Sequence, residues 1–271
     1  MKKLFVLLLV AVMTAISLTA VVGCSDKTDL ETVKKKGVLR VGITVYEPMD
    51  YYNEDETDFI GFDADLSRAF AKELGVEVKF VLITWSQKVL ELKNGEIDCI
   101  WNGMTASEEL GKEIDLSVAY ATNMQCVVAK KENAANYNGI DDVKAAKIAV
   151  EQGSAANTVC NTVLNLDASK LNAVTAQVDA LTEVKSNASD LAMIDYTMAY
   201  SVVGKGEFAD LQIVDVNKVS FDKEEFAIGF RKGSDLTAKA DAFLKKAYQD
   251  GTMAELLTKY EGVALNENAL K

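Results

Sequence analysis

The sequence predicts an α/β protein built of two lobes. Strand-like and helix-like segments alternate along the 271 residues, and the alternation restarts after about residue 123. Successive strand–helix–strand units are typical of parallel sheets whose faces are covered by helices. A chain of this length also has enough residues for two separate cores. We therefore expect two α/β lobes, each a mainly parallel sheet flanked by helices, with a cleft between them.

The first unit contains three expected strands, at 38–43, 76–83 and 97–101, and two expected helices, at 61–75 and 86–95. The longer helix is indicated by Leu66, Phe70 and Leu74, which recur every four residues. Asp63 stands where it can cap this helix, and Gly75 is suited to end it.

The second unit alternates in the same way. Strands are expected at 124–131, 147–150, 171–174, 190–194 and 211–214, with helices after 151 and at 176–187, and a further strand at 225–233 is followed by helices at 235–249 and 252–261. The last helices have no sheet of their own to cover, so we expect them to pack on the first unit. The chain then crosses twice between the lobes, near 120–126 and 224–230.

The N-terminus reads as an export signal. A basic start (MKK) precedes a long apolar run that ends in Gly23–Cys24, and this ending resembles a bacterial lipobox whose cysteine is lipidated. The alternative is an uncleaved membrane anchor with an incidental cysteine. We expect a signal peptide at 1–23, a lipidated Cys24 with a polar tether at 24–36, lobe 1 at 37–122 plus 229–262, and lobe 2 at 123–228.

Charge excludes one class of partner. Without Lys2 and Lys3 of the signal, 27 basic side chains face 41 acidic ones, a formal net charge of −14. Nucleic-acid binding needs a basic patch, and the only dense one is VKKKG at 33–37. We expect no nucleic-acid partner, and the acidic balance weakly favours cationic small molecules.

The cysteines and the missing histidine limit the chemistry. Cys99, Cys126 and Cys160 are an odd number, and Cys99 and Cys126 stand in strand-like apolar runs, which favours buried thiols over a redox pair. The chain has no histidine and no CxxC. We therefore expect no metal site and no catalytic residues of the histidine-dependent kinds.

Two loops share one local design. CIWNGMTAS (99–107) and AVEQGSAAN (149–157) each run from a strand through a glycine to a hydroxyl residue at a helix start. Backbone N–H groups near Thr105 and Ser154 are suited to attract an anion, although such turns are commonly structural.

Further candidates follow other strands. Asp195 comes directly after a buried-type strand, where it is suited to bind an ammonium group or to cap a helix. Tyr46, in the loop after the first strand, and Trp85 either stack on a ligand or pack within the protein.

Together these motifs resemble the family 3 solute-binding proteins of polar amino acid ABC transporters. The resemblance spans about Gly37 to Gly262 and rests on nine segments in order: GVLRVGI, GFDADLSRAFAKELG, Trp85, LKNGEIDCIWNGMT, IDLSVAY, VEQGS, DLAMID, FAIGFRKGS and AYQDGTMAELLTKYEG. It implies a periplasmic-binding-protein-like fold of type II, with two lobes that close on a ligand across two hinge strands, no cofactor, and delivery to a membrane permease and ATPase.

The resemblance also implies roles for single residues. Trp85 matches the family's aromatic wall, while Met49 replaces the aromatic of the opposite wall. Gly103 and Thr105 match the loop that binds an α-carboxylate, Ser154 the second-lobe turn that clasps it, and Asp195 the aspartate that binds the α-ammonium.

One position departs from the family. After GMT the family carries an arginine that pairs with the α-carboxylate, and counting back from IDLSVAY places Leu110 there, with Lys112 at a surface position. Losing such a pair removes roughly 1.5–3 kcal/mol. We therefore expect an amine-bearing solute whose carboxylate is absent or unimportant.

The function expected from the sequence is that of a monomeric, lipid-anchored, extracytoplasmic receptor of an ABC importer, which captures an amino acid or a related amine-bearing solute and is not an enzyme. Two alternatives remain open at this stage. One is a ligand-sensing module without transport, and the other is a secreted dehydratase-like enzyme on the same scaffold.

Overall fold

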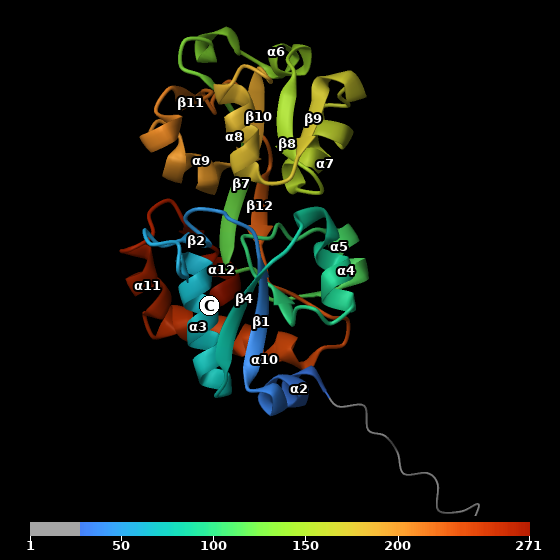
Figure 1. Ribbon diagram of the computed structural model, residues 1–271, viewed down its shortest axis with the longest axis vertical. Coiled ribbons are helices and arrows are strands. Elements are labelled where there is room, and N and C mark those ends of the chain that lie inside the picture. The colour runs from blue at the N-terminus through green and yellow to red at the C-terminus, as the bar shows by residue number, and fades with distance from the viewer. Residues whose placement is uncertain (1–27) are drawn as a thin grey trace, which may run out of the picture.

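The computed structural model describes residues 28–271, which form two α/β lobes along the long axis of the molecule (Figure 1). The predicted fold class is confirmed. The sheet of lobe 1 has the strand order β4-β1-β5-β13-β6, and that of lobe 2 has the order β11-β7-β10-β8-β9. Each sheet contains three adjacent parallel strands, to which antiparallel strands are added. The signal peptide and Cys24 lie outside the described residues.

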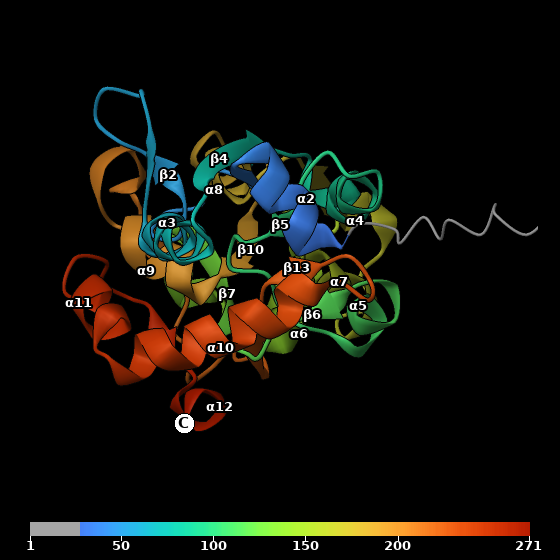
Figure 2. The same cartoon turned by 90° about the horizontal axis from the view of Figure 1, so that it is seen from below.

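Lobe 1 is built from both ends of the chain. Its elements are α2 (Asp29–Lys36), β1 (Val38–Ile43), β2 (Tyr51–Tyr52), β3 (Phe59–Ile60), α3 (Phe62–Leu74), β4 (Glu77–Leu82), η1 (Trp85–Gln87), α4 (Lys88–Lys93), β5 (Cys99–Ile100), α5 (Glu108–Glu113), β6 (Asp115–Leu116), β13 (Gly229–Phe230), α10 (Asp235–Gln249), α11 (Thr252–Leu257), β14 (Ala264–Leu265) and α12 (Glu267–Leu270). The predicted helix period is seen in α3, where Leu66 and Phe70 are buried and Leu74 is half-buried. Figure 2 shows α10 crossing the lower face of this lobe beside α2.

Lobe 2 is one continuous stretch of chain. Its elements are β7 (Ala121–Lys130), η2 (Ala134–Asn136), α6 (Ile140–Ala145), β8 (Ile148–Glu151), α7 (Ala155–Thr162), η3 (Ala168–Lys170), β9 (Leu171–Val174), α8 (Gln177–Lys185), β10 (Leu191–Asp195), α9 (Tyr196–Val202), η4 (Gly206–Phe208), β11 (Leu211–Ile213) and β12 (Lys223–Phe226). All five residues of β10 are buried, as expected for a central strand with helices on both faces.

Two strands run between the lobes. The first part of β7, Ala121–Met124, pairs antiparallel with β12, and the rest of β7 pairs with β10 in the sheet of lobe 2. The expected strand at 225–233 is two strands, because β12 ends at Phe226 and β13 begins at Gly229 in the other lobe.

The expected tether is shorter than predicted. Residues 29–36 form α2, whose side chain Val33 is fully buried and whose first turn is tied to lobe 1. Asp29 pairs with Arg231, and the Leu30 N–H donates to Asp235. The sequence suggested a tether because the helix is short and polar, and the residues that bind its first turn, Arg231 and Asp235, are distant in the chain.

The expected cap at Asp63 is also wrong. Helix α3 begins after Gly61, at φ +131°, and Asp63 lies inside it with no exposed surface. Its Oδ2 accepts hydrogen bonds from the Gly103 N–H and the Tyr120 hydroxyl, both at 2.7 Å. Asp63 therefore supports the loop after β5 from within lobe 1.

Cys99, Cys126 and Cys160 are buried free thiols, as expected from their apolar surroundings. Within residues 28–271 no helix is long and apolar enough to span a bilayer.

Candidate functional site

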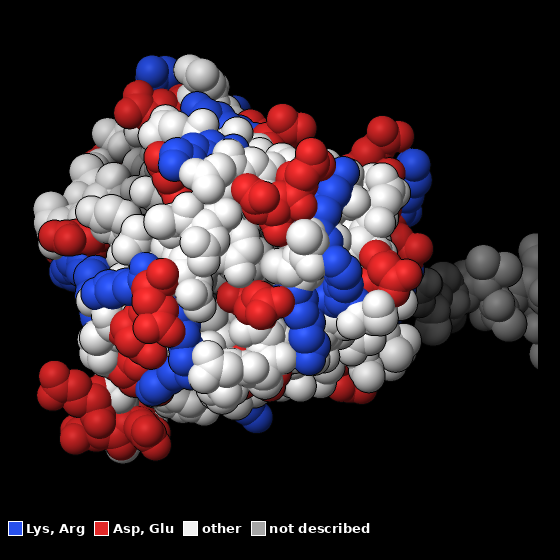
Figure 3. Space-filling view, turned by 90° about the horizontal axis from the view of Figure 1, so that it is seen from above, with Lys and Arg blue, Asp and Glu red and all other residues white. Residues whose placement is uncertain are grey.

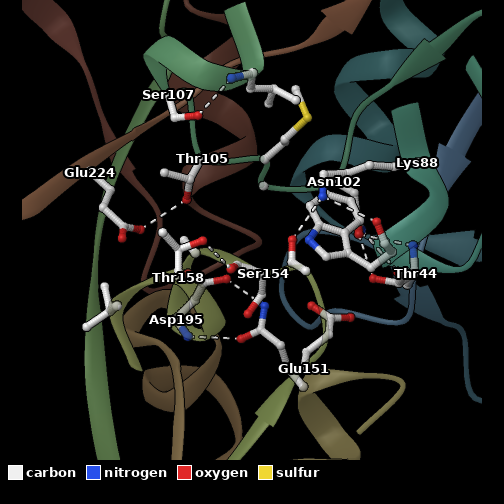
Figure 4. Close-up of a pocket in the computed structure, with 18 of the residues that line it drawn as sticks. Thr44, Lys88, Asn102, Thr105, Ser107, Glu151, Ser154, Thr158, Asp195 and Glu224 are labelled. Carbon is white, nitrogen blue, oxygen red and sulfur yellow. Dashed lines mark hydrogen bonds between the residues drawn. The ribbon is translucent and has the colours of Figure 1, made fainter. Parts of the chain in front are cut away.

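A cavity of about 830 Å³ lies between the lobes (Figure 4). This volume falls in the range that holds small organic ligands. Its walls come from the loops after β1, β5, β8 and β10, from α4, α5 and α7, and from β12. Of the predicted site residues, it is lined by Tyr46, Trp85, Gly103, Thr105, Ser154, Asp195 and Leu110.

Met49 is the exception. Its side chain is fully buried in the core of lobe 1 and does not line the cavity. The backbone carbonyl of Met49 accepts the Asp63 and Ala64 N–H groups at the start of α3, so the residue is held behind the site. The side wall it was expected to supply is formed by Tyr46, whose ring is only 2% exposed.

The lobe 1 loop forms a wall of the cavity, and its polar groups already make hydrogen bonds within the protein. Gly103 has φ +54°, and its N–H donates inward to Asp63. The Thr105 hydroxyl donates to Glu224 Oε2 at 3.0 Å, and Ser107 Oγ accepts the Leu110 N–H as the cap of α5. This loop therefore shows fewer free donors for an anion than its sequence suggested.

Leu110 lies in the cavity wall and is half-buried. Lys112 is 66% exposed and lies 3.4 Å from Glu108 on the same helix. Neither residue brings a positive charge into the cavity.

The lobe 2 loop has the same design. Ser154 caps α7 by accepting the Asn157 N–H, and Gly153 has φ +75°. The Ser154 N–H is bonded to the carbonyl of Glu151, so this turn is closed on itself.

Asp195 is the most strongly positioned carboxylate of the site. It ends β10 and is 7% exposed, and its oxygens accept hydrogen bonds from three side-chain amides. The donors are Asn123 at 2.6 Å, Gln125 at 2.7 Å and Gln177 at 2.6 Å. Burial raises the pKa of Asp195 to about 7, and these amides oppose the rise by stabilising its charged form.

Glu224 is a second carboxylate, which sequence analysis did not find. It lies on β12, and its Oε2 accepts from Gln125 at 2.8 Å as well as from Thr105. Its charge adds to burial in raising the pKa of Asp195, so the two carboxylates lie close together. Its strand is an alternating polar stretch, and no local pattern in that stretch marks Glu224 as facing a cleft.

Glu151 is a third carboxylate that sequence analysis missed. It is the last residue of β8 and is only 2% exposed, yet it lines the cavity. Its position directly after a buried strand is the signal that pointed to Asp195, and the same signal was available here.

Lys88 is the one basic residue of the cavity lining. Its Nζ donates to the carbonyls of Gly153 at 3.0 Å and Trp85 at 3.3 Å, and it lies 4.5 Å from the centre of the Trp85 ring. Lys88 therefore joins lobe 1 to lobe 2 across the mouth of the cavity. Burial lowers its pKa to about 8.

The charge of the cavity is thus strongly acidic. Its lining carries five carboxylates and one ammonium group, namely Glu109, Glu113, Glu151, Asp195 and Glu224 against Lys88. The end of the molecule seen in Figure 3, by contrast, carries acidic and basic side chains interspersed. Among the described residues, no group of three or more potential ligands is arranged to hold a metal ion. The arrangement suits an organic cation.

Comparison with known proteins decides the family. The bacterial extracellular solute-binding proteins, family 3, match residues 39–263 of this sequence. The chain belongs to this family. Its expected roles as a solute-binding protein and as an extracytoplasmic protein are therefore confirmed.

Individual relatives extend over nearly the whole chain. The arginine-binding extracellular protein ArtP of Bacillus subtilis (strain 168) is 30% identical over 264 residues, which cover 96% of this chain and 98% of ArtP. A crystal structure of an amino acid ABC transporter substrate-binding protein from Streptococcus pneumoniae Canada MDR_19A bound to L-arginine has a TM-score of 0.79 at 25% identity, covering 88% of this chain and all of that one.

A third similar protein is relevant to the alternative of a dehydratase-like enzyme on the same scaffold. The ancestral amino acid-binding protein AncCDT-1, a precursor of cyclohexadienyl dehydratase, has a TM-score of 0.76 at 29% identity, covering 86% of this chain and 99% of that one. The fold is therefore shared by binding proteins and by the precursor of an enzyme.

Proposed function

We propose that this chain is the lipid-anchored receptor of an ABC importer and captures an amine-bearing cation, without catalysis, by closing its lobes. The excess of carboxylates over cations in the cavity carries this proposal. A buried charge is costly unless it is paired, and a cationic ligand supplies the pairing that the protein lacks. The arginine named for two of the relatives is consistent with a cationic ligand.

The ligand class is narrowed by Leu110. Because an apolar side chain lines the cavity where the family arginine is expected, an α-carboxylate finds no bidentate partner there. Glu151, Asp195 and Glu224 would also repel it. We therefore propose that the ligand is bound through positive nitrogen groups and that its carboxylate is absent or unimportant.

Lobe closure is supported by contacts across the cleft. Lys88 of lobe 1 reaches the Gly153 carbonyl of lobe 2, and Ser201 of lobe 2 donates to Glu47 of lobe 1 at 3.0 Å. Both contacts would break when the lobes separate. An ABC permease and ATPase are the proposed partners of the closed monomer, and lipidation at Cys24 would keep it at the membrane.

Matched ligand pairs test the ligand class. Agmatine and cadaverine differ from arginine and lysine by the carboxylate alone, and glutamine serves as a neutral amino acid. Thermal unfolding and calorimetry of the purified chain from residue 28 should show agmatine and cadaverine binding at least as tightly as arginine and lysine. A ligand at a hundred times its Kd adds about 2.7 kcal/mol to the free energy of unfolding. Tight glutamine binding with no response to the amines would overturn the proposal.

Lipid anchoring has its own test. Cells expressing the full chain should incorporate a labelled fatty acid into it, and Cys24→Ser should abolish the label and release the protein from membranes. Cys126→Ser is the matched control, because that buried thiol should leave labelling unchanged. Equal labelling of the Cys24→Ser protein would contradict anchoring at this residue.

A further inference from the structure

Glu151 is a buried carboxylate for which the protein provides no partner. Its Oε1 is inaccessible to solvent and, within residues 28–271, has no hydrogen-bond partner. In Figure 4 its carboxylate points into the cavity, on the same side as Asn102 and Lys88. An unpartnered buried carboxylate costs free energy, so such a group in a binding cavity indicates a contact that forms only with a ligand.

The nearest cation does not fill this role. Lys88 lowers the pKa of Glu151 by its charge, but its ammonium group donates to the carbonyls of Trp85 and Gly153, and no ion pair joins it to Glu151. Asp195 and Asp179, which also face Glu151, carry the same charge as Glu151 and repel it.

Asp195 and Glu151 differ in their surroundings. Asp195 is held by three amides, and Glu224 lies close to it. Glu151 ends a different strand, β8, with no such support. These two carboxylates and Glu224 line the cavity with only Lys88 to offset them, so when all three are ionised a ligand with a single positive charge leaves one negative charge uncompensated.

We propose that Glu151 binds a second positively charged nitrogen of the ligand, so that the site is specific for dications such as diamines and aminoguanidines. The inference rests on the proposed function, since it assigns a second contact within the same cavity. One nitrogen group is bound by Asp195 and Glu224, and the other by Glu151. The carbon chain between them lies along the apolar surface of Leu110 and Trp85.

Burial supports this assignment independently of the contacts. It raises the pKa of Glu151 to about 8, with the charge of Asp195 as the next cause. A nitrogen cation bound to Glu151 favours its charged form and lowers this pKa. Binding of a diamine near pH 7 therefore releases a proton, and Lys88, Asp195, Asp179 and Glu224 are the charged groups that share in this titration.

Cadaverine and pentylamine test the proposal, because they have the same carbon chain and differ by one amine. Calorimetry on the chain from residue 28 should show cadaverine binding about 10- to 100-fold more tightly than pentylamine, the range for one charge-assisted hydrogen bond. Glu151→Gln should reduce this ratio to about threefold or less and leave the pentylamine affinity nearly unchanged. The Glu108→Gln variant removes the same charge from the exposed surface of α5 and should keep the full ratio.

A proton measurement covers the case in which Glu151→Gln does not fold. Calorimetry of the unsubstituted protein in buffers of different ionisation enthalpy should show more proton release with cadaverine than with pentylamine. Equal affinities of the two amines, or a ratio that survives Glu151→Gln, would overturn the second site while leaving the proposed function intact. Binding of neither amine, together with no response to agmatine, would overturn both.

Discussion

The two loops that close the cavity are alike in sequence and different in what they contact. Each runs from a strand through a glycine with positive φ to a serine that caps a helix. Gly103 packs against its own lobe, where an added Cβ would lie 2.7 Å from the Tyr46 ring. Gly153 packs against the other lobe, where an added Cβ would lie 2.9 Å from Ser86 Cα.

The charges of the two loops differ as well. The lobe 1 loop presents Leu110 to the cavity, and its glycine N–H is turned inward to Asp63. The lobe 2 loop begins with Glu151, a buried carboxylate whose Oε1 has no hydrogen-bond partner among residues 28–271. One backbone design therefore forms a wall in lobe 1 that presents Leu110 and packs against its own lobe, and an acidic wall in lobe 2 that presents Glu151 and packs against the other lobe. The ligand preference depends on the side chains carried by the loops, since the turns themselves are the same.

The largest expected effect comes from adding a positive charge to the lobe 1 wall at Leu110. Leu110→Arg should increase the affinity for L-glutamine by about ten- to a hundredfold, because a guanidinium at this position can pair with an α-carboxylate. Cadaverine affinity should fall, since the arginine would compete for the same carboxylates. Isothermal calorimetry with L-glutamine and with cadaverine measures both changes in affinity. Leu110→Met is the control of similar volume and should change neither affinity; no glutamine gain in Leu110→Arg would place the carboxylate contact elsewhere.

The sequence predicted the fold far better than the site. Apolar periodicity places elements such as Leu171–Val174 and α3 because burial on one face is a local property of the chain. Asp195 was found by its place after a strand, although its three amide partners come from β7 and α8 and are distant in sequence. Glu224 escaped notice because only the crossing of β12 between the lobes turns it into the cavity.

Asp63 and Met49 are the opposite case, because sequence analysis gave each a role that the structure does not. A local rule suggested Asp63 as a helix cap and the family resemblance implied Met49 as a ligand wall, but both are fully buried inside lobe 1. Asp63 accepts the Gly103 N–H from the loop after β5, a contact between residues distant in the chain that no spacing in the sequence encodes.

Gly103 and Gly153 allow a matched test of a loop that packs against its own lobe and a loop that packs against the other lobe. Gly103→Ala should destabilise the fold by about 2 kcal/mol, through backbone strain at positive φ and a clash with a buried ring that has no room to move. Gly153→Ala should cost about 1 kcal/mol, because the lobes can separate to relieve the contact with Ser86. Its cadaverine affinity should instead fall about tenfold, since closure brings the new Cβ against Ser86.

Thermal unfolding measures the two losses of stability. Calorimetry measures the loss of cadaverine affinity, and the radius of gyration from X-ray scattering measures how far the lobes close. Ligand-saturated Gly153→Ala should remain larger than the ligand-saturated unsubstituted protein. Equal compaction of the two would show that Gly153 does not limit closure.

The most gradual expected effect is a dependence of stability on pH, which is spread over several pH units and which both walls share. Burial raises the pKa of Glu151 to about 8 and those of Asp195 and Asp63 to about 7, all above the values these groups have when unfolded. The folded protein then binds more protons than the unfolded chain between about pH 5 and 8, so its stability falls as pH rises through this window. Each such proton contributes at most about 1.4 kcal/mol per pH unit. Above this window the lowered pKa of Lys88 acts in the opposite direction.

Adding ligand distinguishes the contributions of the cavity carboxylates to this pH dependence from that of Asp63. Saturating cadaverine should remove the part of the slope due to Glu151 and Asp195, because a bound cation favours their charged forms, and leave the part due to Asp63, which does not line the cavity. Thermal unfolding at half-unit steps from pH 5 to 8, with and without cadaverine, measures both parts, and Glu151→Gln should flatten the ligand-free curve alone. A melting temperature that rises with pH in the free protein would mean that these carboxylates are already charged when folded, and that the acidic wall has partners other than the ligand.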